Sequence, residues 1–559
     1  MDQGVGEVDT RPLLSQDMEE LPQDEDHSHT AAASVEEKWY DNPLQVMAMT
    51  SNFSTSYNVV NISLVLPILE QLHTEEHSED AAASGSSLLA GMILGQVLGG
   101  ALGDSFLGRL GALRLVMALQ VIASIGSCSL ERNDEGDIYL HLAAWRFVLG
   151  LGCGAVYPLA AVLSAEQGQT TNNEAEPDND HDDSEVHEAS DQVETTENTS
   201  SSDDSSDQIH RVVLTFSTQG LGFVTVPILA VVLLHLTENL DLVWRLLLGF
   251  GSVPGIMLLL LQWNDYRRSR LYGTTIPTIE EEDEVENNPS EDEQAVTTET
   301  TTTTSDDVEV PSSTRQQGQE ESDGILVGSI DEQQQEEENH GIWDSIRHEP
   351  ELGRKLLGTA GTWFLFDVLF YGNTLFQPLV VEAAFGGSSS EDAIELLQKT
   401  AQDSLILNSL SLPGYMIAGW VLGKRTLCLT QTPRYVMLQG FFFMGILYMA
   451  IGANWDYLRG YPLLLVFLYG MTFFFANYGP NTTTFILPSL VYSHDCRSTL
   501  NGISAASGKL GALVGATFFE PVADDLGDDK VMMICSAIAV LACALTYLFV
   551  PKSQAGFAS

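Results

Sequence analysis

The sequence predicts an all-α membrane protein with twelve transmembrane helices in two six-helix halves. The prediction rests first on a conflict in composition, because 44% of the residues are hydrophobic while the formal net charge is -53. A compact soluble domain would repel itself at that charge, and a disordered chain would not contain so much apolar sequence. Position resolves the conflict, since about two thirds of the 77 acidic residues lie in residues 1–43, 165–210 and 264–350.

The remaining sequence consists of apolar runs of about 20 residues or more, the length that a helix needs to cross a bilayer. The first six runs lie near 45–69, 87–107, 111–130, 138–163, 211–236 and 242–263, and the second six near 356–385, 403–423, 433–453, 461–487, 498–520 and 531–550. The runs are too long for strands and lack a two-residue alternation. Six spans, a long polar break and six more spans are typical of a transporter built from two halves.

The polar segments set the boundaries of the predicted regions. We expect transmembrane helices in 44–163, 211–263 and 351–551. We expect disorder in the acidic segments, which have few aromatic residues: the tail 1–43 and the inserts 164–210 and 264–350. Lys and Arg gather at one set of span ends, so both inserts, the N-terminal tail and the short C-terminal tail 552–559 are predicted to be cytosolic. No cleavable signal peptide is expected, because residues 1–43 contain no apolar core.

Composition also argues against several classes of function. Only 24 Lys and Arg accompany the 77 acids, so nucleic acid is not an expected partner. The six cysteines form no CxxC pair, so neither a disulfide framework nor a metal site is indicated. No nucleophile–base pair or phosphate-cradling glycine loop indicates an enzyme, and no cofactor is expected. The expected surroundings are a lipid bilayer.

The first half carries polar and small residues at places where an apolar span would not need them. The second span ends in GQVLGGALGDSFLGR, which sets Asp104 beside Arg109 at the membrane edge. The fourth span reads RFVLGLGCGAVYPLAAVLSAE, and Pro158 breaks the helical ladder next to Tyr157. Gln219 lies inside the fifth span, where an amide marks a cavity or a helix contact.

The second half contains charged residues within its spans. Trp363, Asp367 and Tyr371 are four residues apart, so they form one stripe of a helix. An acid at that depth is a functional hypothesis by default. Lys509 lies in a run of small residues in the eleventh span, and Asn481 follows a proline in the tenth. A lysine that cannot reach the interface needs a counter-ion, for which Asp367 and an anionic ligand are the candidates.

These strings resemble the phosphate:proton symporters of the major facilitator superfamily, of the fungal and plant high-affinity inorganic phosphate transporter type. The similarity is strongest around residues 358–377 and 477–515. The resemblance implies alternating-access transport of inorganic phosphate, with protons as the coupling ion. It implies a phosphate site formed by Tyr157, Gln219, Trp363, Asp367, Tyr371, Asn481 and Lys509.

The chain departs from this family where protons are concerned. The family's Thr-Asp-Ala-Tyr-Asp in the first span is replaced by STSYN, so Thr55 and Asn58 stand in place of the two acids. Val156 stands where the family has an acid before the tyrosine of the fourth span. Asp367 is therefore the remaining proton-coupling candidate, and a facilitator or an exporter is an alternative to a symporter.

An acidic dileucine pattern in the N-terminal tail predicts an address. Asp9, Leu13 and Leu14 fit [DE]-x-x-x-L-[LI], which adaptor proteins read in cytosolic tails. The pattern favours a vacuolar or endolysosomal membrane, with the plasma membrane as the next choice.

The sequence also leaves two alternatives to a carrier of inorganic phosphate. In the first, the chain transports an organophosphate such as a glycerophosphodiester. In the second, the chain is a phosphate sensor that signals through its acidic inserts.

Overall fold

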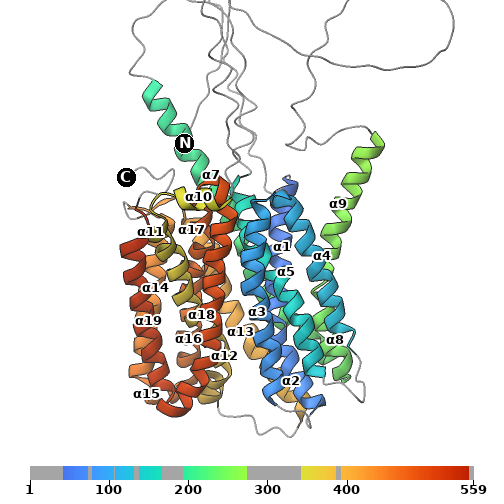
Figure 1. Cartoon of the computed structure of the whole chain (residues 1–559). Coiled ribbons are helices and arrows are strands. Elements are labelled where there is room, and N and C mark those ends of the chain that lie inside the picture. The colour runs from blue at the N-terminus through green and yellow to red at the C-terminus, as the bar shows by residue number, and fades with distance from the viewer. Residues whose placement is uncertain are drawn as a thin grey trace, which may run out of the picture.

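The structure is a computed structural model in which the chain forms a bundle of long helices (Figure 1). It describes residues 42–73, 78–105, 107–130, 138–166, 193–272, 342–385, 392–426 and 429–552. Most of the predicted N-terminal and C-terminal tails and most of the two acidic inserts lie outside these described residues. The same is true of Asp9, Leu13 and Leu14.

The first half consists of helices that precede residue 273. They are α1 (Pro43–Val60), α2 (Ile62–Leu72), α3 (Ser78–Gly103), α4 (Gly108–Cys128), α5 (Ile138–Glu166), α7 (Val193–Leu236), α8 (Leu240–Phe250) and α9 (Val253–Tyr272). Asn61 interrupts the first span between α1 and α2, and α8 and α9 together form the sixth.

The described part of the second half is built from helices and one two-residue ladder. Its elements are α10 (Ile342–His348), α11 (Leu352–Leu356), η1 (Leu357–Gly361), α12 (Thr362–Phe385), α13 (Ala393–Val421), β1 (Arg425–Thr426), β2 (Leu429–Thr430), α14 (Pro433–Ala453), α15 (Trp455–Arg459), α16 (Pro462–Ala476), η2 (Asn477–Asn481), α17 (Thr482–Val491), η3 (His494–Cys496), α18 (Arg497–Leu526) and α19 (Asp528–Phe549). β1 and β2 pair antiparallel.

Nine helical segments of the described chain are long and apolar enough to cross a membrane. Three further long segments (43–72, 362–385 and 497–526) complete the six-plus-six order, and they carry many of the buried polar residues. Large apolar side chains such as Leu140, Leu236 and Leu463 are exposed on the outer faces, as lipid contact requires. The predicted all-α membrane fold is confirmed.

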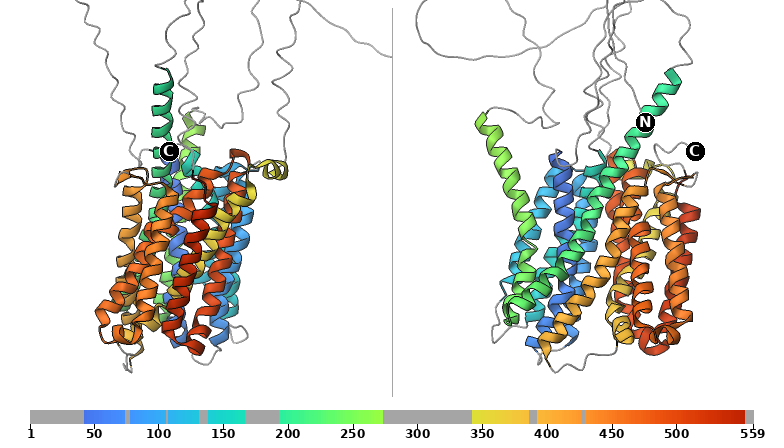
Figure 2. Two further views of the ribbon diagram at one scale, coloured as in Figure 1. Left: turned by 90° about the vertical axis from the view of Figure 1, so that its left-hand side faces the viewer. Right: turned by 180° about the vertical axis from the view of Figure 1, so that it is seen from behind.

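The two ends of the bundle differ, and we name them by their elements. The α10 end carries α10, α11 and the starts of α1 and α12, whereas the far end carries α2 and α15 (Figures 1 and 2). Helix α7 begins at Val193, inside the insert 164–210 for which we expected disorder, and so projects beyond the bundle at the α10 end. Helix α9 similarly continues to Tyr272 rather than ending near residue 263.

Stripes of small residues bring the central helices into backbone contact. A Cβ added to Gly95 of α3 would overlap the backbone of Leu151 in α5, and one added to Gly154 of α5 would overlap Met92. In the second half, Gly511 and Gly515 of α18 lie equally close to the backbone of α12. Helices without side chains at the contact can approach closely, which offsets the lack of a hydrophobic driving force in lipid. The close approach of α18 to α12 determines the geometry of the site.

Candidate functional site

An ion pair buried between α12 and α18 lies at the centre of the candidate site. The Lys509 ammonium donates to Asp367 Oδ2 over 2.8 Å, and these side chains are 4% and 2% exposed. Each charge has taken the other as its counter-ion, as the sequence suggested for Lys509. Since removing either partner would leave an uncompensated buried charge, the pair is costly to break.

Aromatic side chains enclose the ammonium group. Lys509 also donates to the Tyr371 hydroxyl over 3.0 Å. Its Nζ lies 4.4 Å from the centre of the Tyr371 ring and 5.6 Å from that of Tyr157. Trp363 contributes a hydrogen bond to the Asp367 carboxylate and packs against Gly508, the residue before the lysine. Aromatic faces attract a cation through their ring quadrupoles, so Tyr371 and Tyr157 add to the attraction that Asp367 exerts on Lys509.

A chain of hydrogen bonds continues from this cluster across the two halves. Tyr157 of α5 donates to Gln219 Oε1 of α7 over 3.3 Å, and Gln219 donates to the Tyr415 hydroxyl of α13 over 3.4 Å. Asn481 of η2 donates to the same hydroxyl over 2.8 Å. All seven residues expected from the resemblance therefore lie in one connected cluster. Tyr415 was not predicted, because an isolated tyrosine in an apolar span gives no signal in the sequence.

Irregular backbone positions the second-half side chains. Residues 477–481 form a π-helical turn around Pro480, which widens the helix where Asn477 and Asn481 face inward. The Asn481 amide is held in place because it also donates to Asn477 Oδ1 over 2.8 Å. Such π-helical turns occur often at functional sites.

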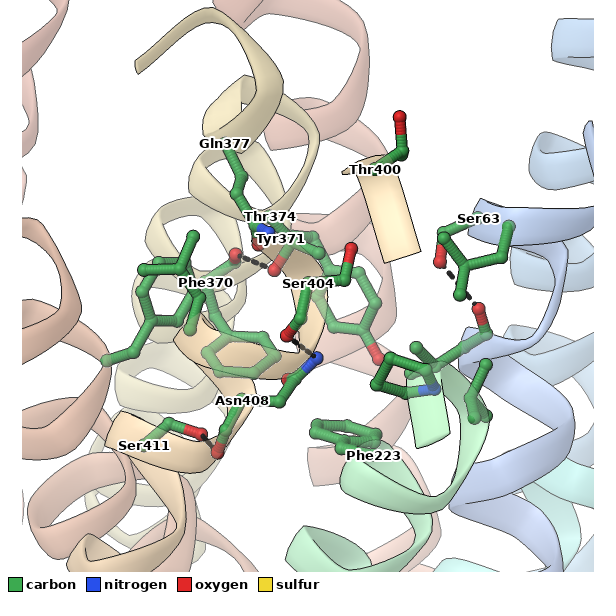
Figure 3. Close-up of a pocket in the computed structure, with 16 residues that line it drawn as sticks. Ser63, Phe223, Phe370, Tyr371, Thr374, Gln377, Thr400, Ser404, Asn408 and Ser411 are labelled. Atoms are coloured by element: carbon green, nitrogen blue, oxygen red, sulfur yellow. Dashed lines mark hydrogen bonds between the residues drawn. The ribbon is translucent and has the colours of Figure 1, made fainter. Parts of the chain in front are cut away.

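A cavity of about 110 Å³ reaches the cluster from the far end (Figure 3). Tyr371 belongs to both the cluster and the cavity wall. The other lining residues are neutral: Val60, Ser63, Leu64, Phe223, Val226, Pro227, Phe370, Thr374, Gln377, Thr400, Ser404, Leu407, Asn408, Ser411 and Phe473. Several polar groups already donate to their own helices, as Thr374 does to Phe370 O and Asn408 does to Ser404 O. The oxygens of these groups are left to accept hydrogen bonds from a ligand.

The α10 end is closed by charged contacts between the halves. Glu166 of α5 accepts from Arg109 over 2.8 Å and from Arg497 of α18 over 3.0 Å. Asp104 accepts from the backbone N–H of Thr499 over 2.7 Å and from its hydroxyl over 2.8 Å. A cavity at one end and ion pairs at the other describe a state that is closed at the α10 end.

Two residues at the α10 end have shifted pKa values, for different reasons. Burial, together with the nearby Arg109 and Arg497, lowers the pKa of His494 in η3. Burial alone would raise the pKa of Glu349, but hydrogen bonds from Lys355 and from the Ser493 N–H outweigh it and lower the pKa. Glu349 thereby attaches the segment after α10 to the loop before η3.

The polar interior of the first half is neutral at the three positions where acids were expected. Gln120 donates to Thr55 Oγ1 over 2.9 Å, Asn58 donates to Gly251 O over 3.0 Å, and Val156 is fully buried.

Arg146 of α5 is also fully buried, and its Nη1 donates to Asn61 Oδ1 over 2.9 Å. The sequence reasoning missed Arg146, although it lies inside the predicted span 138–163, where a charged residue is itself a functional signal. Within the described residues, no group of three or more His, Cys, Asp or Glu side chains could hold a metal ion.

Comparisons with known proteins agree with this architecture. The profile of the family described as "Sugar (and other) transporter" matches residues 44–172 and 422–556. The solved structure of the proton:xylose symporter XylE bound to 6-bromo-6-deoxy-D-glucose has a TM-score of 0.55 at 14% identity. That alignment covers 92% of this chain and 97% of XylE. At such low identity the likeness establishes the fold.

Sequence relatives narrow the class. Inorganic phosphate transporter PT2 of Toxoplasma gondii (strain ATCC 50861 / VEG) is 28% identical over 445 residues, which is 79% of this chain and 60% of that protein. Inorganic phosphate transporter 1-11 of Oryza sativa subsp. japonica is 39% identical over 168 residues, or 29% of each chain. The matches thus span less than two thirds of the length of either relative.

Two helical halves joined by polar contacts, with a buried polar cluster between them, are an arrangement that many secondary transporters share. The chain has the fold of XylE, a protein of the major facilitator superfamily, and the transporter profile matches a part of each half. Within that superfamily its similarity is to the inorganic phosphate transporters.

Proposed function

We propose that this chain transports inorganic phosphate across a membrane by alternating access. The observation that carries the proposal is the buried Lys509–Asp367 pair, which lies where groups from both halves converge. An ammonium supplies charge for an oxyanion, and phenol, indole and amide groups supply hydrogen bonds to its oxygens. The relatives named as inorganic phosphate transporters support the same cargo.

The geometry gives each residue a role in this proposal. Phosphate enters through the far-end cavity, meets Tyr371, and displaces Asp367 as one of the partners of Lys509. Tyr157, Gln219 and Asn481 then donate to oxygens from the opposite side. The Asp367 carboxylate would repel a bare anionic oxygen, but it can accept a hydrogen from a protonated phosphate hydroxyl. Release requires the ion pairs at the α10 end to separate.

Proton coupling in this proposal depends on Asp367 alone. The first-half positions Thr55, Asn58 and Val156 are buried, and their side chains cannot change charge. Lys509 favours the ionised form of Asp367. A phosphate anion that draws Lys509 away would favour the protonated form, so substrate binding and protonation would be linked through one proton.

Transport in sealed vesicles tests the proposal. The full chain is reconstituted into proteoliposomes, and uptake of labelled phosphate is measured at several imposed pH gradients. Saturable uptake that unlabelled phosphate inhibits is expected. No uptake and no exchange, despite phosphate binding by the purified protein, would instead favour a sensor.

The far-end cavity favours a second candidate cargo, an organophosphate. Its neutral wall combines hydroxyl and amide acceptors with Phe223, Phe370 and Phe473, which suits the alcohol part of a small phosphate ester. Glycerophosphodiesters and inorganic phosphate would be compared as competitors of labelled phosphate uptake. If the ester inhibits uptake at a lower concentration than unlabelled phosphate does, the organophosphate and not inorganic phosphate is the principal cargo.

We also propose a vacuolar or endolysosomal location, on the basis of Asp9, Leu13 and Leu14. Replacing Leu13 and Leu14 with alanine should move the protein toward the cell surface, since adaptor binding requires both side chains. Imaging of the full chain provides the measurement, with Pro12→Ala as the matched control. An unchanged distribution would mean that the dileucine carries no address.

A further inference from the structure

Arg146 is a buried cation that has no acidic partner among the described residues. Five charged residues of the described chain are buried as whole residues: Arg146, Glu349, Asp367, Arg434 and Lys509. Glu349 pairs with Lys355, Asp367 pairs with Lys509, and Arg434 donates to the Tyr547 carbonyl over 2.7 Å at the start of α14. Arg146 is fully buried within a span, and its partner among the described residues is the neutral amide of Asn61.

The unsatisfied part of the guanidinium is specific. Nη1 is bonded to Asn61, whereas Nε and Nη2 of Arg146 have no hydrogen-bond partner among the described residues. These two nitrogens form the edge that normally binds a carboxylate in two-pronged fashion. An uncompensated buried charge costs several kcal/mol. Such a charge is retained at a cost in stability, and it therefore calls for a functional reason.

Arg146 lies on the helix face that leads to the candidate site. Cys153 and Tyr157 follow it by seven and eleven residues, which places all three on one side of α5. Eleven residues correspond to about 16 Å along a helix. Since Asp367 and Lys509 cancel, Arg146 gives the interior a net positive charge before substrate arrives. An anion that enters the site restores neutrality.

We propose that Arg146 is a fixed cation that raises the affinity of the carrier for its anionic substrate by acting through space. The inference rests on the proposed function, because it requires a substrate that is an anion. At an effective dielectric constant of about 20, unit charges about 16 Å apart change an affinity about fivefold. Burial protects this interaction from screening by salt. Arg146 acts on the substrate only through the electric field of its charge and does not touch it.

Two substitutions test the proposal in different ways. Arg146→Met removes the charge and should weaken phosphate binding about fivefold. Asn61→Asp keeps the guanidinium but gives it a carboxylate at the position of the oxygen that it already contacts at 2.9 Å. The pair is then neutral, so phosphate binding should fall by a similar factor although the fold gains an ion pair. A purely structural Arg146 predicts that Asn61→Asp leaves phosphate affinity unchanged.

The affinities are measured by titration calorimetry of inorganic phosphate against the purified full chain in nanodiscs. Thermal unfolding of each variant shows whether it is folded. Arg146→Lys should retain wild-type affinity because it keeps the charge. Arg434→Met is the matched control, since it removes a buried arginine that lies away from the site, and it should leave affinity unchanged. Wild-type affinity in Asn61→Asp overturns the proposal even if Arg146→Met does not fold. Absence of phosphate binding by wild type would overturn the proposed function itself.

Discussion

The polar interiors of the two halves differ in how they handle charge. In the second half, Lys509 and Asp367 form a buried ion pair, and both side chains can exchange partners or protons. In the first half, Asn58 and Gln120 make hydrogen bonds between neutral groups, and the buried Arg146 is bonded to the neutral amide of Asn61. A group contributes to coupling only if its charge changes during transport. Under the proposed function, the charges that change during transport therefore belong to the second half, and Arg146 contributes a constant charge in the first.

The largest expected effect comes from breaking the second-half pair. Lys509→Ala should abolish phosphate binding and uptake, because the site loses its cation and Asp367 is left as an unpaired buried acid. Lys509→Arg should retain part of the binding, with altered geometry. Binding assays and vesicle uptake would be measured together. Saturable phosphate uptake by the alanine variant would contradict the assignment of Lys509.

Asp367→Asn separates binding from coupling within the same pair. The amide keeps the shape of the carboxylate but cannot bind a proton, so phosphate exchange should continue while accumulation driven by a pH gradient is lost. Exchange and gradient-driven uptake are compared in one vesicle preparation. If wild type itself accumulates no phosphate against a gradient, the chain is a facilitator. Accumulation coupled to several protons would require groups beyond Asp367.

Replacing Asn58 with aspartate would give the first half a buried group that can change charge, as the second half has in Asp367. Asn58 donates to the Gly251 carbonyl over 3.0 Å, and a protonated aspartate can replace that hydrogen bond, whereas an ionised one cannot. Asn58→Asp should therefore bind a proton in the state described here and make phosphate uptake several-fold more dependent on pH. Asn58→Ser is the neutral control. An unchanged pH profile would show that an acid at this position does not suffice.

The smallest expected effect concerns closure of the α10 end. The pKa of His494 is lowered by burial and by Arg109 and Arg497 in the closed state. Closure is therefore fully favoured above the usual histidine pKa of about 6.5 and weakens as pH falls below it, because protonation favours the open state. Alkylation of the buried Cys496 thiol reports opening. The ratio of the alkylation rate in wild type to the rate in His494→Gln should rise a few-fold from about pH 7.5 to about pH 5.5. A ratio that does not change with pH would show that His494 does not control closure.

The sequence was sufficient for the parts of the site that follow from periodicity and electrostatics. The spacing of Trp363, Asp367 and Tyr371 requires a shared helix face, and a buried Lys509 requires a counter-ion. Tyr415 and Arg146 were missed for different reasons. Tyr415 becomes part of the cluster through the packing of α13 against η2, which no local pattern encodes. Arg146 did give a signal, because it lies inside the predicted span 138–163, but its partner Asn61 is known only from the packing of the first span against α5.

The helix boundaries were the least predictable feature of the fold. Val193 begins a helix in a stretch rich in acidic and hydroxyl side chains, where composition favours disorder. The stretch is continuous with the apolar span of α7, and a helix that has already been nucleated extends at little cost.

The neutral wall of the far-end cavity has a consequence for the kinetics of entry. No charged side chain of the described chain lines it, so these residues exert little long-range attraction on an approaching ion. Association from that side should proceed at an unsteered diffusional rate and vary little with ionic strength. Discrimination between ions then occurs after arrival, when a ligand loses its water beside Tyr371, and differences between ligands should appear mainly in how slowly they leave.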